Sequence, residues 1–177
     1  MSVLLIGLDW ELGEIVVERL LGQGDEVRVL EDDPTRAAMW RTHGAHVATG
    51  HADDADLIER AAQGVRTIVL GGTLPVAHEV ALAAIQDAAT TGRLDVRVVV
   101  HAGGRRDGTA AARSLGEAGL EHVVVMERGR RALGRRSPTR AKVAEALDAA
   151  DDLAGAPRMV LDLTEAEAWR ALGLDPP

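Results

Sequence analysis

The chain has 177 residues, of which 46% are hydrophobic, so it can bury one sizeable core. Its net charge of −8 argues against binding to nucleic acid or to an anionic membrane surface, and the absence of cysteine excludes disulfides, thiolate catalysis and cysteine-based zinc sites. The N-terminal apolar run is too short to span a bilayer and no basic region precedes it. We therefore expect one cytoplasmic domain over residues 1–177. The near-exclusive use of arginine over lysine, with much alanine, glycine and aspartate, is typical of a GC-rich bacterial genome.

Apolar runs alternate with helical patterns along the chain. Strands are predicted at 3–8, 26–30, 45–49, 67–70, 96–100, 122–126 and 159–163. Helices are predicted at 12–21, 35–43, 54–63, 75–91, 109–118, 138–153 and 165–172, with Ser137 as the N-cap of the sixth. This alternation predicts a doubly wound, Rossmann-type α/β fold, with a mostly parallel sheet and helices on both faces. If the chain forms a homodimer, its alanine-rich helices 75–91 and 109–118 are the candidate faces.

The turn after the first strand has the glycine spacing of a dinucleotide site. Such glycines let main-chain amides approach a pyrophosphate at the N-terminus of a helix. The position of the middle glycine is occupied by Trp10, so the indole either plugs the site or swings out to stack on a flat ligand. The predicted cofactor contacts here are Gly7, Leu8, Asp9, Trp10, Glu11, Leu12 and Gly13.

A second set of cofactor contacts is predicted at the ends of the next strands. Asp32 lies nineteen residues after Gly13, where a carboxylate would bind the ribose hydroxyls and repel a 2′-phosphate, so NAD is preferred over NADP. Glu31 and Asp33 flank it and compete for this role, and a solvated acidic turn is the alternative interpretation. The fourth strand runs into Gly71 and Gly72, which are predicted to border the same site.

Two titratable side chains end later strands, at the edge where open α/β sheets bind ligands. His101 and Glu127 could act as an acid–base pair, or be polar groups with Glu127 paired to an arginine. The basic segment 128–142 is predicted to be a loop, in which Arg128, Arg130 and Arg131 are candidate contacts for an anionic small molecule. It could equally pair with acidic helices or contact another subunit. No aromatic residue interleaves its arginines, which argues against a nucleic-acid platform.

Four segments, in order, resemble motifs of the atypical short-chain dehydrogenase/reductase group, which includes NmrA-like and NAD(P)H-binding proteins. They are residues 7–13, 47–54 (VATGHADD), 114–125 (SLGEAGLEHVVV) and 139–147 (TRAKVAEAL). The resemblance implies a Rossmann fold that binds NAD or NADP, with His51 and Ala52 near the adenine. Reductases of this group use a tyrosine, a lysine four residues on and a serine. This chain has no tyrosine, so that machinery is absent.

A second family, the potassium-uptake regulatory nucleotide-binding domain, is similar over residues 7–72, but its first and last glycines are one residue closer together.

Four functions remain open. They are an NAD-binding protein of non-standard oxidoreductase activity, a nucleotide sensor, a scaffold that has lost its cofactor, and a cofactor-free enzyme that uses His101 and Glu127. His43 and His46 form an H-x-x-H pair that is not predicted to bind metal, because no helix carries both.

Overall fold

The computed structural model describes residues 2–71, 75–103, 105–127, 138–155 and 158–176. Seven parallel strands form one sheet in the order β3-β2-β1-β4-β5-β6-β7. The strands are β1 (Ser2–Ile6), β2 (Glu26–Glu31), β3 (His46–Thr49), β4 (Thr67–Leu70), β5 (Arg97–Ala102), β6 (His122–Met126) and β7 (Arg158–Asp162). The helices are α1 (Trp10–Gly22), α2 (Pro34–Thr42), α3 (Ala55–Ala62), α4 (Pro75–Thr90), α5 (Arg105–Glu117), α6 (Arg140–Asp151) and α7 (Ala166–Ala171).

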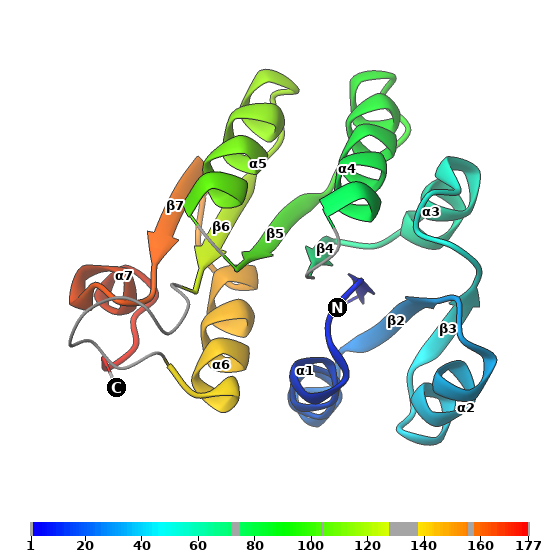
Figure 1. Ribbon diagram of the computed structural model, residues 1–177, viewed down its shortest axis with the longest axis horizontal. Helices are drawn as coiled ribbons and strands as arrows, with labels where there is room; N and C mark the ends of the chain where they lie inside the picture. Colours follow the sequence, from blue (N-terminus) through cyan, green and yellow to red (C-terminus); the bar gives the residue numbers. More distant parts are fainter. Residues whose placement is uncertain (1, 72–74, 104, 128–137, 156–157, 177) are drawn as a thin grey trace.

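The helices cover both faces of the sheet. Figure 1 shows α1, α2, α6 and α7 on one side, and α3, α4 and α5 on the other. Alternate strand residues supply the two cores, so that Val3 and Leu5 of β1 face the first layer while Leu4 and Ile6 face the second. The predicted doubly wound α/β fold is confirmed, with every strand pair parallel.

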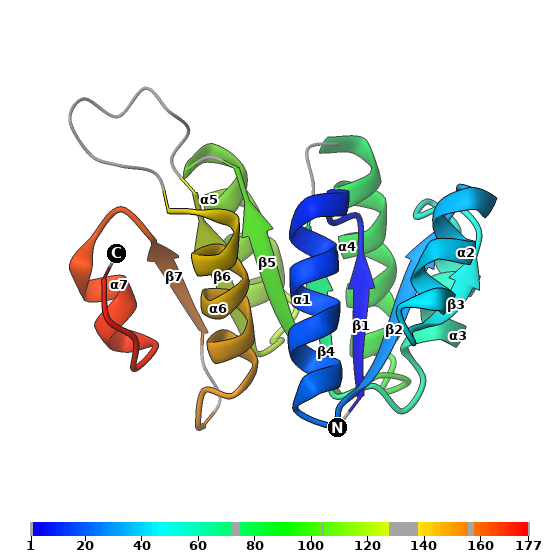
Figure 2. The ribbon, with the colours of Figure 1, turned by 90° about the horizontal axis from the view of Figure 1, so that it is seen from below.

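Parallel strands place all of their carboxyl ends at one edge of the sheet. Figure 2 shows the strand arrows pointing to this edge, where α1 and α6 also begin. Each helix N-terminus presents unpaired amides and a partial positive charge. The residues that follow β1, β2, β4 and β6 therefore lie along one rim of the molecule, which we call the carboxyl edge.

Several predicted boundaries were wrong, for local reasons. The first strand ends at Ile6 rather than Leu8, because Gly7 turns the chain with a φ of 69° and α1 begins two residues earlier than predicted. Thr139, not Ser137, is the N-cap of α6, since its side chain accepts a hydrogen bond from the amide of Lys142. The fifth strand continues through Ala102, which places His101 inside the sheet.

Within the described residues, no helix combines the length and the apolar character needed to cross a membrane.

Candidate functional site

The turn after β1 packs directly against the end of β4. Gly7 has a left-handed backbone, and a Cβ there would lie 2.6 Å from the carbonyl oxygen of Gly71. The side chain of Leu8 is buried over Gly71, where a Cβ would overlap it and come within 3.0 Å of its Cα. These glycines are therefore required by the close approach of two strand ends in the chain itself.

The N-terminus of α1 offers free hydrogen-bond donors beside this turn. Asp9 is the N-cap, and its Oδ1 accepts from the amide of Leu12 at 3.0 Å. The main-chain N–H groups of Trp10 and Glu11 have no hydrogen-bond partner among the residues described. Two free amides and the positive end of the helix dipole thus lie at the position where dinucleotide-binding folds bind phosphate.

Trp10 is turned toward α2. Its ring centroid lies 4.4 Å from that of Trp40, at an interplanar angle of 38°. Trp40 is fully buried and packs on Gly13, where a Cβ would lie 2.9 Å from the Trp40 ring. The indole of Trp10 therefore packs at a tilt against a second indole of its own chain, at the border of the first core layer.

The structure separates the three acidic residues after β2. Glu31 is buried, accepts a hydrogen bond from Nε1 of Trp40 at 3.2 Å and pairs with Arg36 at 3.1 Å. Asp33 is the N-cap of α2, and two amides of the first turn donate to it at 2.7 and 3.0 Å. These amides lower the pKa of Asp33. Both flanking carboxylates thus have structural roles.

Asp32 is the carboxylate without such a role. Its side chain is 55% exposed and contacts Nδ1 of His51, at 3.1 Å, in the loop after β3. The two residues that were predicted to meet the ribose and the adenine therefore lie side by side. Ala52 is half-buried and packs on the core of the second layer, while Glu11 is exposed and Leu12 is buried in the first layer.

His101 and Glu127 meet at the other end of the carboxyl edge. His101 Nε2 lies 3.3 Å from Glu127 Oε2, and the histidine side chain is only 8% exposed. Arg140, the first residue of α6, lies 3.6 Å from the same carboxylate and 3.2 Å from Oδ2 of Asp9. The four side chains form a continuous row, His101–Glu127–Arg140–Asp9, which we call the edge network.

Arg140 is a site residue that the sequence analysis did not assign. An arginine at the first position of a helix opposes the helix dipole, and this unfavourable placement was the available signal. The Asp9 and Glu127 carboxylates compensate it. Gly72, Arg128, Arg130 and Arg131 lie outside the described residues.

The His101–Glu127 contact predicts a pH-dependent contribution to stability. The hydrogen bond from His101 lowers the pKa of Glu127 below its ordinary value of 4.5, and the charges of His101 and Arg140 add to this effect. Ionised Glu127 therefore stabilises the fold above about pH 4.5, and the contribution is lost as the pH falls through the lowered pKa. We expect Glu127→Gln to reduce the free energy of unfolding by about 1–2 kcal/mol at pH 7.

Urea unfolding of both proteins between pH 3 and pH 7 checks this. The difference in unfolding free energy between the wild type and Glu127→Gln should shrink toward pH 3. A difference that stays constant or grows would contradict the proposed contribution of ionised Glu127. The matched control is Glu79→Gln, because Glu79 is exposed and has no ion pair or side-chain hydrogen bond with any other described residue.

Comparison with known proteins shows that solved Rossmann-fold structures share this fold. No protein-family model and no curated protein sequence matches the chain. The structure is similar to ChuY, an anaerobillin reductase from Escherichia coli O157:H7, with a TM-score of 0.68 and 17% identity over 92% of this chain and 96% of that one. It is also similar to an NADPH-dependent quinone oxidoreductase (QOR2) from Escherichia coli, with a TM-score of 0.68 and 18% identity over 89% of this chain and 66% of that one.

A third similar structure is the triphenylmethane reductase of Citrobacter sp. complexed with NADP(H). Its TM-score is 0.71, with 15% identity over 91% of this chain and 69% of that one. At these identities the likeness establishes the shared fold. The predicted resemblance to NAD(P)-binding Rossmann reductases is confirmed at that level.

Proposed function

We propose that the chain binds a nicotinamide adenine dinucleotide at the carboxyl edge, NAD(H) rather than NADP(H), and works as a non-standard oxidoreductase or a nucleotide sensor. The observation that carries the proposal is the exposed Asp32 beside His51, because both flanking carboxylates have structural roles. A carboxylate there accepts hydrogen bonds from ribose hydroxyls and repels a 2′-phosphate.

The residues around the first turn fit a diphosphate. The free amides of Trp10 and Glu11 supply two donors at the positive end of α1. Asp9 places a negative charge at the same spot, and Arg140 neutralises it at 3.2 Å. A guanidinium binds phosphate through two parallel hydrogen bonds, so Arg140 is the residue that would hold the diphosphate beside the amides.

The other end of the edge network supplies a proton donor in place of tyrosine. When bound, the nicotinamide supplies hydride transfer. Nε2 of His101 faces Oε2 of Glu127 at 3.3 Å, so the tautomer that donates to the ionised carboxylate carries its proton on Nε2. The pair can thus hold a proton at the carboxyl ends of β5 and β6, where a general acid would be placed.

Calorimetric titration with NAD⁺, NADH, NADP⁺, NADPH and ADP-ribose tests the proposal. We expect NADH to bind more tightly than NADPH, and ADP-ribose to retain much of the affinity. Asp32→Asn should weaken NADH binding roughly tenfold, because a hydrogen bond to a charged group is lost, and should narrow the discrimination against NADPH. Quenching of tryptophan fluorescence is the second readout, since Trp10 borders the proposed diphosphate site.

The matched control is Asp95→Asn. Asp95 is an exposed aspartate before β5, at the opposite edge of the sheet, and it should leave binding unchanged. Trp10→Gly restores the missing glycine of the turn. If neither the wild type nor Trp10→Gly binds any of these nucleotides at millimolar concentration, the proposal fails.

A second candidate function is supported by the edge network alone. His101 and Glu127 lie 3.3 Å apart with Arg140 beside them, which is the arrangement of an acid–base pair next to an anion-binding cation. This arrangement favours a cofactor-free enzyme that acts on a small anionic substrate. This second function predicts that neither the wild-type protein nor Trp10→Gly binds dinucleotides.

A further inference from the structure

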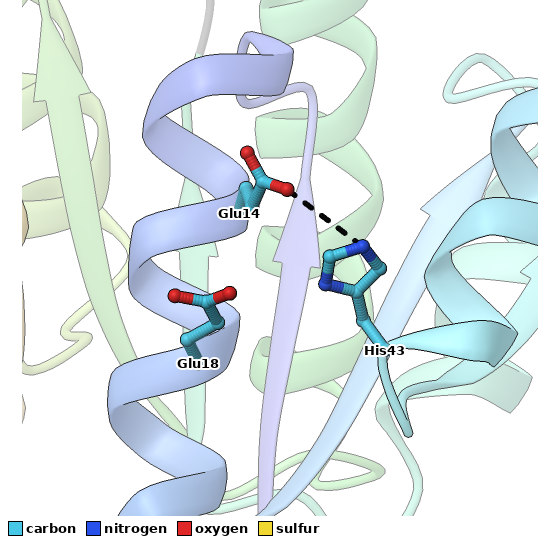
Figure 3. Close-up of side chains that lie close together, drawn as sticks. All are labelled: Glu14, Glu18 and His43. Carbon is cyan, nitrogen blue, oxygen red and sulfur yellow. Dashed lines mark ion pairs between the residues drawn. The ribbon is translucent and has the colours of Figure 1, made fainter.

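Three potential metal ligands converge between α1 and α2, away from the edge network. Glu14 and Glu18 lie one turn apart on α1, and His43 directly follows α2 as its C-cap. One ligand atom from each residue lies within 4.8 Å of the others, and Glu14 Oε1 is 3.7 Å from His43 Nε2. Figure 3 shows Glu14 directed toward the imidazole ring of His43, with Glu18 one turn further along α1. We call these three residues the α1–α2 cluster.

The surrounding packing fixes the histidine before any ion arrives. The ring of His43 stands edge-on to Trp10, with centroids 6.0 Å apart, and to Trp40, with centroids 6.5 Å apart. Trp40 is anchored by its hydrogen bond to Glu31, and its packing on Gly13 brings α1 close to α2. The imidazole is therefore positioned by a buried aromatic group rather than by contact with the glutamates.

The charges of the cluster are incompletely balanced by the protein. Two glutamates one turn apart on a helix repel each other. Glu14 pairs only with His43, and Glu18 has no ion pair within the part of the chain described. At 3.7 Å, the contact between Glu14 and His43 is longer than a hydrogen bond. A divalent cation would neutralise both carboxylates and use the lone pair of a neutral imidazole.

We propose that the α1–α2 cluster binds a divalent first-row transition metal of the Zn²⁺ type. Imidazole nitrogen and carboxylate oxygen are zinc ligands, whereas Mg²⁺ and Ca²⁺ prefer sets made only of oxygen. Zinc lies about 2.0–2.2 Å from such ligands, so the ligand atoms must close to roughly 3.4 Å of one another. The partly exposed glutamate side chains can make this adjustment by changing rotamer, while His43 stays in place. Three protein ligands leave one position for water.

The site ties the middle of α1 to the residue that follows α2. It involves none of the residues proposed to hold a nucleotide except through the contact of His43 with Trp10. Metal binding can therefore be measured without any nucleotide, and its failure leaves the proposed function untouched. His46, the other member of the H-x-x-H pair, is not part of the cluster.

Titration of chelator-treated protein with Zn²⁺ in a calorimeter, and with Co²⁺ by visible absorption, tests the site. We expect one ion per chain, a d–d absorption band for Co²⁺, and a rise in melting temperature with Zn²⁺. His43→Gln and Glu18→Gln should each weaken Zn²⁺ binding at least about tenfold and reduce the Co²⁺ band. Mg²⁺ should not compete at equal concentration.

The matched controls are His46→Gln and Glu11→Gln, which remove the same residue types from neighbouring exposed positions. Both should bind Zn²⁺ as the wild type does. The proposal is overturned if the wild type binds no Zn²⁺, or if His43→Gln binds as tightly as His46→Gln. Far-ultraviolet circular dichroism of each variant establishes that it is folded, so that a loss of binding reports on the ligands.

Discussion

Trp40→Ala is expected to lower the free energy of unfolding by about 3–5 kcal/mol, which is typical of truncating a fully buried aromatic residue. The side chain is 2% exposed, packs on Gly13 and stacks against Trp10. Its removal leaves a cavity between α1 and α2 and takes the indole donor from the buried carboxylate of Glu31. Urea unfolding followed by circular dichroism measures the loss.

Trp40→Phe separates the two contributions. It keeps an aromatic ring against Gly13 and Trp10 but removes the donor to Glu31. It should therefore lower the free energy of unfolding by less than the alanine variant does. A loss below about 1 kcal/mol for Trp40→Ala would show that this layer is not packed as described. Trp10 should also become more exposed in Trp40→Ala, which is measurable as a red shift of its emission.

Gly7→Ala is expected to destabilise the protein by about 3 kcal/mol. A left-handed backbone costs a residue with a Cβ about 1–2 kcal/mol, and forcing extra atoms into a packed site costs about 1–3 kcal/mol. The added methyl group would lie 2.6 Å from the carbonyl oxygen of Gly71, which is main chain and cannot rotate away. The strand ends would have to separate, which would also displace the amides of α1.

The control is Gly22→Ala, at the end of α1. A Cβ there meets nothing within 4 Å, and its φ lies outside the left-handed region. Alanine is the better helix former, so this variant should be neutral or stabilising by up to about 1 kcal/mol. Equal losses in both variants would contradict the close approach of β1 and β4.

Sequence patterns predicted the fold well because its signals are local. The bounds of β4 and β6 were predicted correctly, since both strands are short, β-branched runs that are buried on both faces. Errors arose where a single residue decides a boundary, as with the turn at Gly7 and the cap at Thr139. Such decisions depend on hydrogen bonds of one side chain or one φ angle, which periodicity does not encode.

The candidate site was only partly predictable. Because parallel strands end at one edge of the sheet, the sequence predicted that His101 and Glu127 share that edge. The structure brings the two side chains together. Three adjacent acids could not be told apart from the sequence, because their roles depend on Trp40, on the amides of α2 and on His51. Arg140 was missed because its partners Asp9 and Glu127 lie far from it in sequence and on separate elements.

The edge network makes the two ends of the carboxyl edge thermodynamically dependent on each other. Arg140 shares its single positive charge between Asp9 and Glu127, so an anion that draws the guanidinium toward α1 would raise the pKa of Glu127. By reciprocity, protonation of Glu127 would change the affinity for that anion by the same factor. If the proposed diphosphate binds here, its uptake should therefore be accompanied by a net exchange of protons with the solvent.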